Sequence, residues 1–189
     1  ANYTIDTSNL SEEEVLRKDI RIGDAILIQR AGDVIPQVLS VDLSKRPQNS
    51  KKFIFPTKCP SCGSNTVKEF NSTTKKEDAI TRCPDPNFDC EAILKEKLKH
   101  FVSKDALNIE GLGKKVVENF WNMKLIKYPS DIFSLDYKKI NFLEGWGDLS
   151  TSNLKQAIND SKKISLSKFI FSIGVRHIGQ ENAKILSKY

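Results

Sequence analysis

The 189-residue chain contains four cysteines, which form two close pairs. Two residues separate Cys59 from Cys62, and six separate Cys83 from Cys90. Four thiolates complete the tetrahedral coordination of Zn²⁺ and leave no open position for a substrate. The spacing therefore predicts a structural zinc site whose second pair lies on a longer loop. Two disulfides or four idle thiols are the alternatives, and the close pairing favours the metal.

A second chemistry is indicated by glycine turns that recur in the C-terminal half, 34 and then 32 residues apart. Each turn precedes an amphipathic helical pattern, whose first N–H groups and positive dipole end favour a phosphate. In the third turn His177 replaces the first glycine. Ordinary helix capping is the alternative. The residues predicted to contact a sugar–phosphate backbone in this way are Gly111, Gly113, Lys114, Gly145, Gly147 and Gly179.

The elements that must position these groups suggest a multidomain α+β protein. Short β-rich runs between residues 20 and 41 alternate with turn dipeptides and predict part of a small antiparallel barrel, with one more strand at 53–55. Residues 71–78 are expected to be an exposed hairpin tip and 91–101 a helix. The repeated turns predict an all-α array of helical hairpins. The predicted domains are an incomplete antiparallel barrel at 1–56, a four-cysteine zinc segment at 57–95 and a helical array at 96–189.

Composition and charge argue against a membrane-spanning or exported protein and are compatible with binding to a polyanion. No apolar run approaches the ~18 residues of a membrane span, and the N-terminus lacks the basic and apolar segments of an export signal. The net charge of +6 is compatible with a polyanionic partner, although many lysine-rich proteins bind no nucleic acid. Both ends of the chain are expected to be cut points in a longer sequence.

Several motifs, in colinear order, resemble one family. They are Arg17-Lys18-Asp19-Ile20-Arg21-Ile22-Gly23-Asp24, Ile28-Gln29-Arg30-Ala31-Gly32-Asp33-Val34-Ile35-Pro36-Gln37-Val38, Phe55-Pro56-Thr57 with Cys59-Pro60 and Cys62-Gly63, Leu98-Lys99-His100-Phe101-Val102-Ser103, and Arg176-His177-Ile178-Gly179. The chain resembles the C-terminal half of a bacterial-type NAD⁺-dependent DNA ligase. The resemblance implies that the three predicted domains are a partial oligonucleotide-binding (OB) fold at 1–56, a Cys₄ zinc finger at 57–95 and a helix-hairpin-helix domain at 96–189. Together they would hold nicked double-stranded DNA during replication and repair. It also implies that Arg30, Val34 and Ile35 touch DNA near the nick.

The resemblance limits what this chain does itself. These ligases adenylate a lysine in a Lys-x-Asp-Gly motif, which this sequence lacks. No catalytic residue is therefore expected here, and NAD⁺ and Mg²⁺ are implied for the full enzyme only. A monomer located in the bacterial cytoplasm, associated with the nucleoid, is expected.

The sequence also departs from the family pattern. The finger carries an insertion, the first barrel strands are missing or altered, and Leu149 stands where a basic residue is common after the second turn. His100 and His177 are isolated and are expected to pack or lie beside a phosphate, and Trp146 is expected to be a packing plug. The competing hypotheses are a non-catalytic zinc and hairpin module of a repair factor, and a structural zinc protein that binds no nucleic acid.

Overall fold

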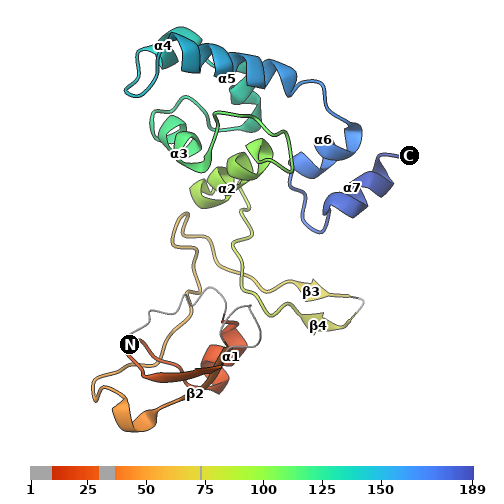
Figure 1. The fold of residues 1–189 in the computed structure, drawn as a ribbon. Helices are drawn as coiled ribbons and strands as arrows, with labels where there is room; N and C mark the ends of the chain where they lie inside the picture. The colour runs from red at the N-terminus through yellow and green to blue at the C-terminus, as the bar shows by residue number, and fades with distance from the viewer. Residues whose placement is uncertain (1–9, 30–36, 73) are drawn as a thin grey trace. The chain divides into compact units, whose positions relative to one another are not determined.

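The computed structural model describes residues 10–29, 37–72 and 74–189, which divide into two compact units. The first unit runs from Ala1 to Pro84 and the second from Asp85 to Tyr189. The fold is α+β as predicted, with small β elements in the first unit and helices in the second (Figure 1). The finer division into three domains stays a prediction.

The second unit is built from helices around one apolar core. Its elements are α2 (Glu91–Val102), α3 (Lys114–Asn122), the 3-10 helix η3 (Pro129–Ser134), α4 (Tyr137–Asn141), α5 (Asp148–Asp160), α6 (Leu166–Ser172) and α7 (Gln180–Leu186). The core side chains include Leu98, Val117, Phe120 and Leu154, all at most 1% exposed. Helix α2 buries Leu94, Leu98 and Phe101 on the side that the periodicity of residues 91–101 predicts, and it also buries Val102.

His100 ties α2 to α6 within this unit. Its Nε2 lies 2.8 Å from the carbonyl oxygen of Phe171, and the two rings meet edge to face at 4.8 Å. A Cβ on Gly174 would lie 3.2 Å from the His100 ring, so the contact is tight. The predicted packing role of His100 is therefore confirmed.

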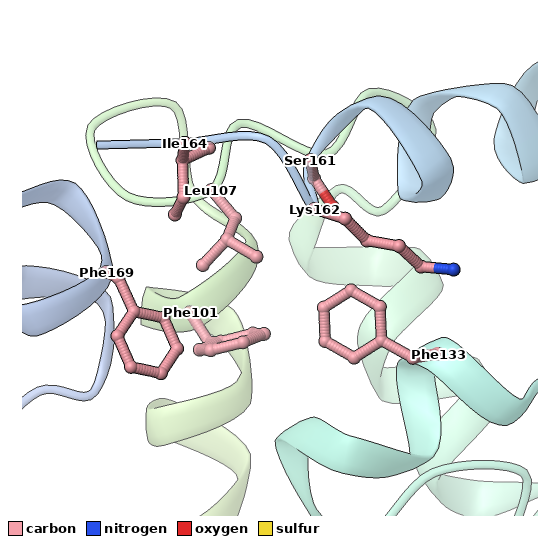
Figure 2. A pocket seen from close by; sticks show the side chains of 7 residues that line it. All are labelled: Phe101, Leu107, Phe133, Ser161, Lys162, Ile164 and Phe169. Atoms are coloured by element: carbon pink, nitrogen blue, oxygen red, sulfur yellow. The ribbon is translucent and has the colours of Figure 1, made fainter. Parts of the chain in front are cut away.

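A small hollow lies at the margin of the core (Figure 2). Its volume is about 280 Å³, and its lining is mostly apolar, with Phe101, Phe133 and Phe169 among the side chains. Ligand sites usually reach 300–1,000 Å³ and carry several converging polar groups. The hollow lacks such a set and is a gap in packing.

In the first unit, α1 (Glu12–Arg17) precedes an antiparallel strand pair. Strands β1 (Ile26–Gln29) and β2 (Gln37–Val41) pair with Ile26 opposite Val41, and the register shifts between Leu27 and Ile28. Such a shift marks a β-bulge, which bends a strand as barrel closure requires. The predicted strands are thus confirmed at Ile26–Gln29 and Gln37–Val41, whereas the first predicted run, around Ile20 and Ile22, forms no strand.

The remaining β predictions have different outcomes. Residues 53–55 form no strand, so that prediction is wrong. The rings of Phe53 and Phe55 instead meet edge to face at 4.8 Å, and no described strand pairs with this segment. The hairpin predicted near 71–78 is present as β3 (Phe70–Asn71) and β4 (Lys76–Glu77).

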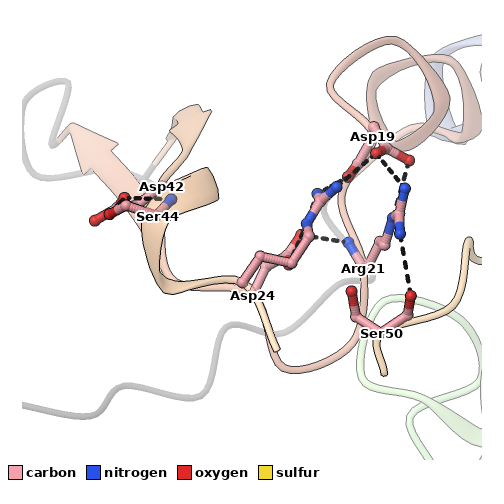
Figure 3. Close-up of polar contacts among 7 residues, drawn as sticks. Asp19, Arg21, Asp24, Asp42, Ser44 and Ser50 are labelled. Atoms are coloured by element: carbon pink, nitrogen blue, oxygen red, sulfur yellow. Dashed lines mark hydrogen bonds and ion pairs between the residues drawn. The ribbon is translucent and has the colours of Figure 1, made fainter. Parts of the chain in front are cut away.

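An ion-pair network fixes the segment before β1 (Figure 3). The guanidinium of Arg46, which follows the 3-10 helix η2 (Leu43–Lys45), makes two hydrogen bonds to the Asp24 carboxylate at 2.8 and 2.9 Å. It also reaches Asp19 Oδ2 at 2.7 Å. Arg21 binds the same Asp19 carboxylate and donates to the carbonyl of Ser50 at 3.0 Å. Segments 27 residues apart are held together by charge where few apolar side chains are buried.

Every helix in the described parts of the chain is too short or too polar to cross a lipid bilayer.

Candidate metal centre and nucleic-acid interface

The four cysteines come together in space. Their sulfur atoms all lie within 4.8 Å of one another. Sulfurs around a tetrahedral Zn²⁺ stand roughly 3.8 Å apart, because each Zn–S bond is about 2.3 Å. Cys62 Sγ and Cys83 Sγ are 3.5 Å apart, far beyond the ~2.05 Å of a disulfide. No disulfide joins any of these four cysteines, so the two-disulfide alternative is wrong.

A tight turn presents the first pair. The N–H of Gly63 donates to the carbonyl of Cys59 at 2.8 Å, and the N–H of Cys59 donates to the carbonyl of Ser64 at 2.8 Å. Gly63 has φ +75°, a conformation that glycine adopts without a Cβ clash. The turn therefore brings Cys59 and Cys62 to one side.

Local hydrogen bonding favours the thiolate form of Cys62. Hydrogen bonds with the side chain and backbone of Ser64 lower the pKa of this thiol to about 6. The Ser64 hydroxyl lies 3.4 Å from the sulfur. Metals bind the thiolate, so this environment favours coordination.

The second pair approaches from a longer loop. Cys90 is the N-cap residue of α2 and is fully buried. Between Cys83 and Cys90 the chain turns through Asp85 and Phe88, both at positive φ. A donor set of four sulfurs, two of them buried, suits Zn²⁺ better than oxygen-seeking cations.

The three predicted turns share one backbone geometry. In each, the N–H of the fourth residue donates to the carbonyl of the first, at 3.2, 3.0 and 3.1 Å, and the third residue has positive φ. A type II turn has this requirement. The third residues are Gly111 (φ +88°), Gly145 (φ +79°) and His177 (φ +65°). His177 therefore keeps the third hairpin in register with the other two.

The fourth residue of each turn packs inward. Leu112 is 2% exposed, and Ile178 is half-buried. Trp146 packs on the core, with its ring centroid 5.5 Å from that of Phe120. The predicted role of Trp146 as a packing plug is confirmed.

The helix beginnings after the turns are not equivalent. Helix α3 has no side-chain cap and no acidic residue in its first turn, which carries Lys114 and Lys115. A Cβ on its N-cap residue, Gly113, would meet no atom within 4 Å. An unpaired, basic and sterically open helix start is a favourable place for a phosphate.

The other two helix starts are less favourable for an anion. The N–H of Gly147 donates to Ser150 Oγ at 2.9 Å, and Asp148 lies in the first turn of α5. Helix α7 follows Gly179, has only seven residues and carries Glu181 in its first turn. Both acidic side chains oppose an incoming phosphate.

The remaining predicted contacts cannot be placed. Arg30, Val34 and Ile35 lie outside the described residues. One residue that the sequence reasoning missed is Asp85, whose carboxylate accepts the N–H of Cys90. An aspartate two residues after a metal-type cysteine is the signal that could have indicated it.

Comparison with known proteins agrees with the site chemistry. Residues 1–50 match the family described as the NAD-dependent DNA ligase OB-fold domain. A DNA ligase of Pelagibacter ubique is 62% identical over 179 residues, covering 95% of this chain and 26% of the relative. DNA ligases of Ehrlichia chaffeensis and Xanthobacter autotrophicus are 48% and 45% identical, each over 95% of this chain and 26% of the relative. The chain thus spans about a quarter of the length of the curated relatives it matches.

Proposed function

Because this chain is homologous to NAD-dependent DNA ligases over about a quarter of their length, we propose that it binds nicked double-stranded DNA for such an enzyme. In this role it aligns the two ends of the nick while a separate adenylation domain carries the catalytic lysine. The observation that carries the proposal is the start of α3, where Gly113 and Lys114 follow a turn with positive φ at Gly111.

The first hairpin supplies the main phosphate contact. The N–H groups at the start of α3 have no partner inside the helix and can donate to phosphate oxygens. Lys114 and Lys115, both exposed, add positive charge at the same end. Gly145, Gly147 and Gly179 are assigned weaker contacts, because each neighbouring helix start carries an acidic residue. The barrel residues Arg30, Val34 and Ile35 are proposed to contact the DNA near the nick.

The cysteine cluster is proposed to hold a structural Zn²⁺. Cys59, Cys62, Cys83 and Cys90 would fill all four positions of the metal, so the ion would stabilise the fold and take no part in joining DNA. NAD⁺ and Mg²⁺ are assigned to the whole enzyme and not to this chain. The proposed setting is the bacterial cytoplasm.

Binding of this chain to nicked duplex DNA, measured over a range of salt concentrations, tests the proposal. Contacts dominated by phosphate make log Kobs fall linearly with log salt concentration, by about 0.9 per phosphate neutralised. With about four contacts, affinity should fall on the order of 10²-fold between roughly 50 and 200 mM salt.

Charge reversal provides the site-specific control. Lys114→Glu with Lys115→Glu should abolish most of the affinity, whereas Lys162→Glu with Lys163→Glu, in the segment between α5 and α6, should change it less. Absent or salt-independent binding by the parent chain would contradict the proposal, and equal losses in both double variants would contradict the placement at α3.

A further inference from the structure

The loop between Cys83 and Cys90 contains a buried acidic residue. Asp85 is only 7% exposed, although aspartate is rarely buried without a partner. Its backbone has φ +47°, in the left-handed region that non-glycine residues seldom occupy. Both features are locally unfavourable, and such features tend to gather at functional sites.

One oxygen of Asp85 closes the loop on itself. Asp85 Oδ1 accepts the N–H of Asp89 at 3.0 Å and the N–H of Cys90 at 2.8 Å. The Asp85 carbonyl also accepts the N–H of Phe88 at 3.1 Å. These three hydrogen bonds fix the loop from Asp85 to Cys90, which is longer than the loop of a usual zinc knuckle. One of them holds the backbone amide of Cys90, a cysteine of the cluster.

The second carboxylate oxygen of Asp85 destabilises the folded loop. Asp85 Oδ2 is buried and has no hydrogen-bond partner among the described residues. A buried oxygen left without a hydrogen-bond donor destabilises a fold, and the cost is larger when the group is charged. The bonds made by Oδ1 must offset this cost, so the loop depends on them.

We propose that Asp85 is a positioning residue of the metal site. Its Oδ1 accepts the N–H of Cys90 and thereby fixes the position of the Cys90 thiolate. This role depends on the zinc site proposed above. Residues that orient metal ligands through hydrogen bonds commonly change metal affinity by about 10–100-fold when removed. Helix α2 begins directly after Cys90, so the same bonds also set where that helix starts.

Two substitutions distinguish the effect of losing the hydrogen-bond acceptor of Asp85 from the effects of its backbone conformation and its charge. Asp85→Gly accommodates φ +47° and removes the acceptor, whereas Asp85→Asn tolerates the conformation, keeps an acceptor oxygen and loses the charge. Zinc transfer from each reconstituted chain to a colorimetric chelator gives a release rate. Asp85→Gly should release zinc about tenfold faster than the parent, and Asp85→Asn should stay within about twofold.

A spectroscopic readout and a matched control complete the test. In Co²⁺-loaded chains, the visible absorption bands should shift in Asp85→Gly and match the parent in Asp85→Asn. Asp89→Asn removes a neighbouring exposed charge and should leave both rate and spectrum unchanged. If Asp85→Gly loses α2 on circular dichroism, Asp85→Glu, which keeps the charge but moves the oxygens, should release zinc faster than the parent.

The outcomes are distinct. Parent-like release and spectrum in Asp85→Gly, or release from Asp85→Asn as fast as from Asp85→Gly, would overturn the positioning role. If Asp85→Gly loses α2, parent-like release from Asp85→Glu would overturn it equally. A parent chain that retains no stoichiometric zinc would instead remove the proposed metal site, and the role of Asp85 with it.

Discussion

At the scale of single residues, backbone conformation explains a position where the sequence pattern is broken. The third turn lacks its first glycine, yet His177 takes the same left-handed conformation as Gly111 and Gly145. A residue with a Cβ is strained there, because the Cβ approaches the following carbonyl oxygen. The turn hydrogen bond from Ile178 to Val175, at 3.1 Å, shows that the geometry is kept despite this strain.

Replacing this histidine should stabilise the protein. His177→Gly relieves the strain but adds freedom to the unfolded chain, so the expected net gain is about 0.5–1 kcal/mol. Chemical denaturation followed by circular dichroism measures it. His177→Ala keeps the strain and loses the ring, and should give no gain. A glycine variant no more stable than the alanine variant would contradict the assignment of strain to this position.

At the scale of elements, the hairpins share a turn but differ in the helix that follows. The start of α3 is open and basic, whereas α5 begins with a hydrogen bond from Gly147 to Ser150 and an acidic Asp148. Phosphate binding depends on these first helical residues more than on the glycines themselves. A repeated motif can therefore differ in function from one copy to the next.

Adding a side chain at the N-cap of α3 tests this difference. Gly113→Val places methyl groups in open space at φ −66°, so it should block a phosphate without unfolding the helix. Affinity for nicked duplex should fall about tenfold, since hydrogen bonds to charged groups contribute about 1.5–3 kcal/mol. Gly147→Val is the matched change at α5 and should weaken binding less. Equal affinity of Gly113→Val and the parent, with both folded, would rule out phosphate contact there.

At the scale of the whole molecule, the two units are stabilised by different means. Of the hydrophobic side chains described as buried, only Val38 and Cys59 belong to the first unit, and the rest lie in the second. The first unit relies instead on charge, since the Asp24 side chain, paired with Arg46, is only 1% exposed. We therefore expect the first unit to respond more strongly to acid.

The acid response follows from the direction of the pKa shifts. Hydrogen bonds from Arg21 and then Arg46 lower the pKa of Asp19 to about 2, and Arg46 lowers the pKa of Asp24. Because an unfolded aspartate titrates near 3.9, this stabilisation is fully present above about pH 4 and is lost as the pH falls toward 2.

The Arg46→Gln variant should therefore be less stable than the parent at pH 6, and the difference should shrink toward pH 2. Urea unfolding followed through amide NMR signals of β1 and β2 measures it. Lys45→Gln, which removes a largely exposed charge, should show a smaller and flatter effect. A stability difference between Arg46→Gln and the parent that does not change with pH would contradict the role assigned to the two carboxylates.

Sequence alone determined the features that depend on short-range spacing. The cysteine pairs predicted the four-sulfur cluster, the repeated glycines predicted three hairpins, and 3.6-residue periodicity predicted α2, because each signal lies within a few residues of the group it positions. Only the tertiary structure decided the rest. It showed that residues 53–55 have no partner among the described strands, that Asp85 accepts a hydrogen bond from the Cys90 N–H, and that Arg46 joins Asp19 and Asp24. Strand pairing, burial and ion pairing each require a partner whose position follows from the folded chain and not from local sequence.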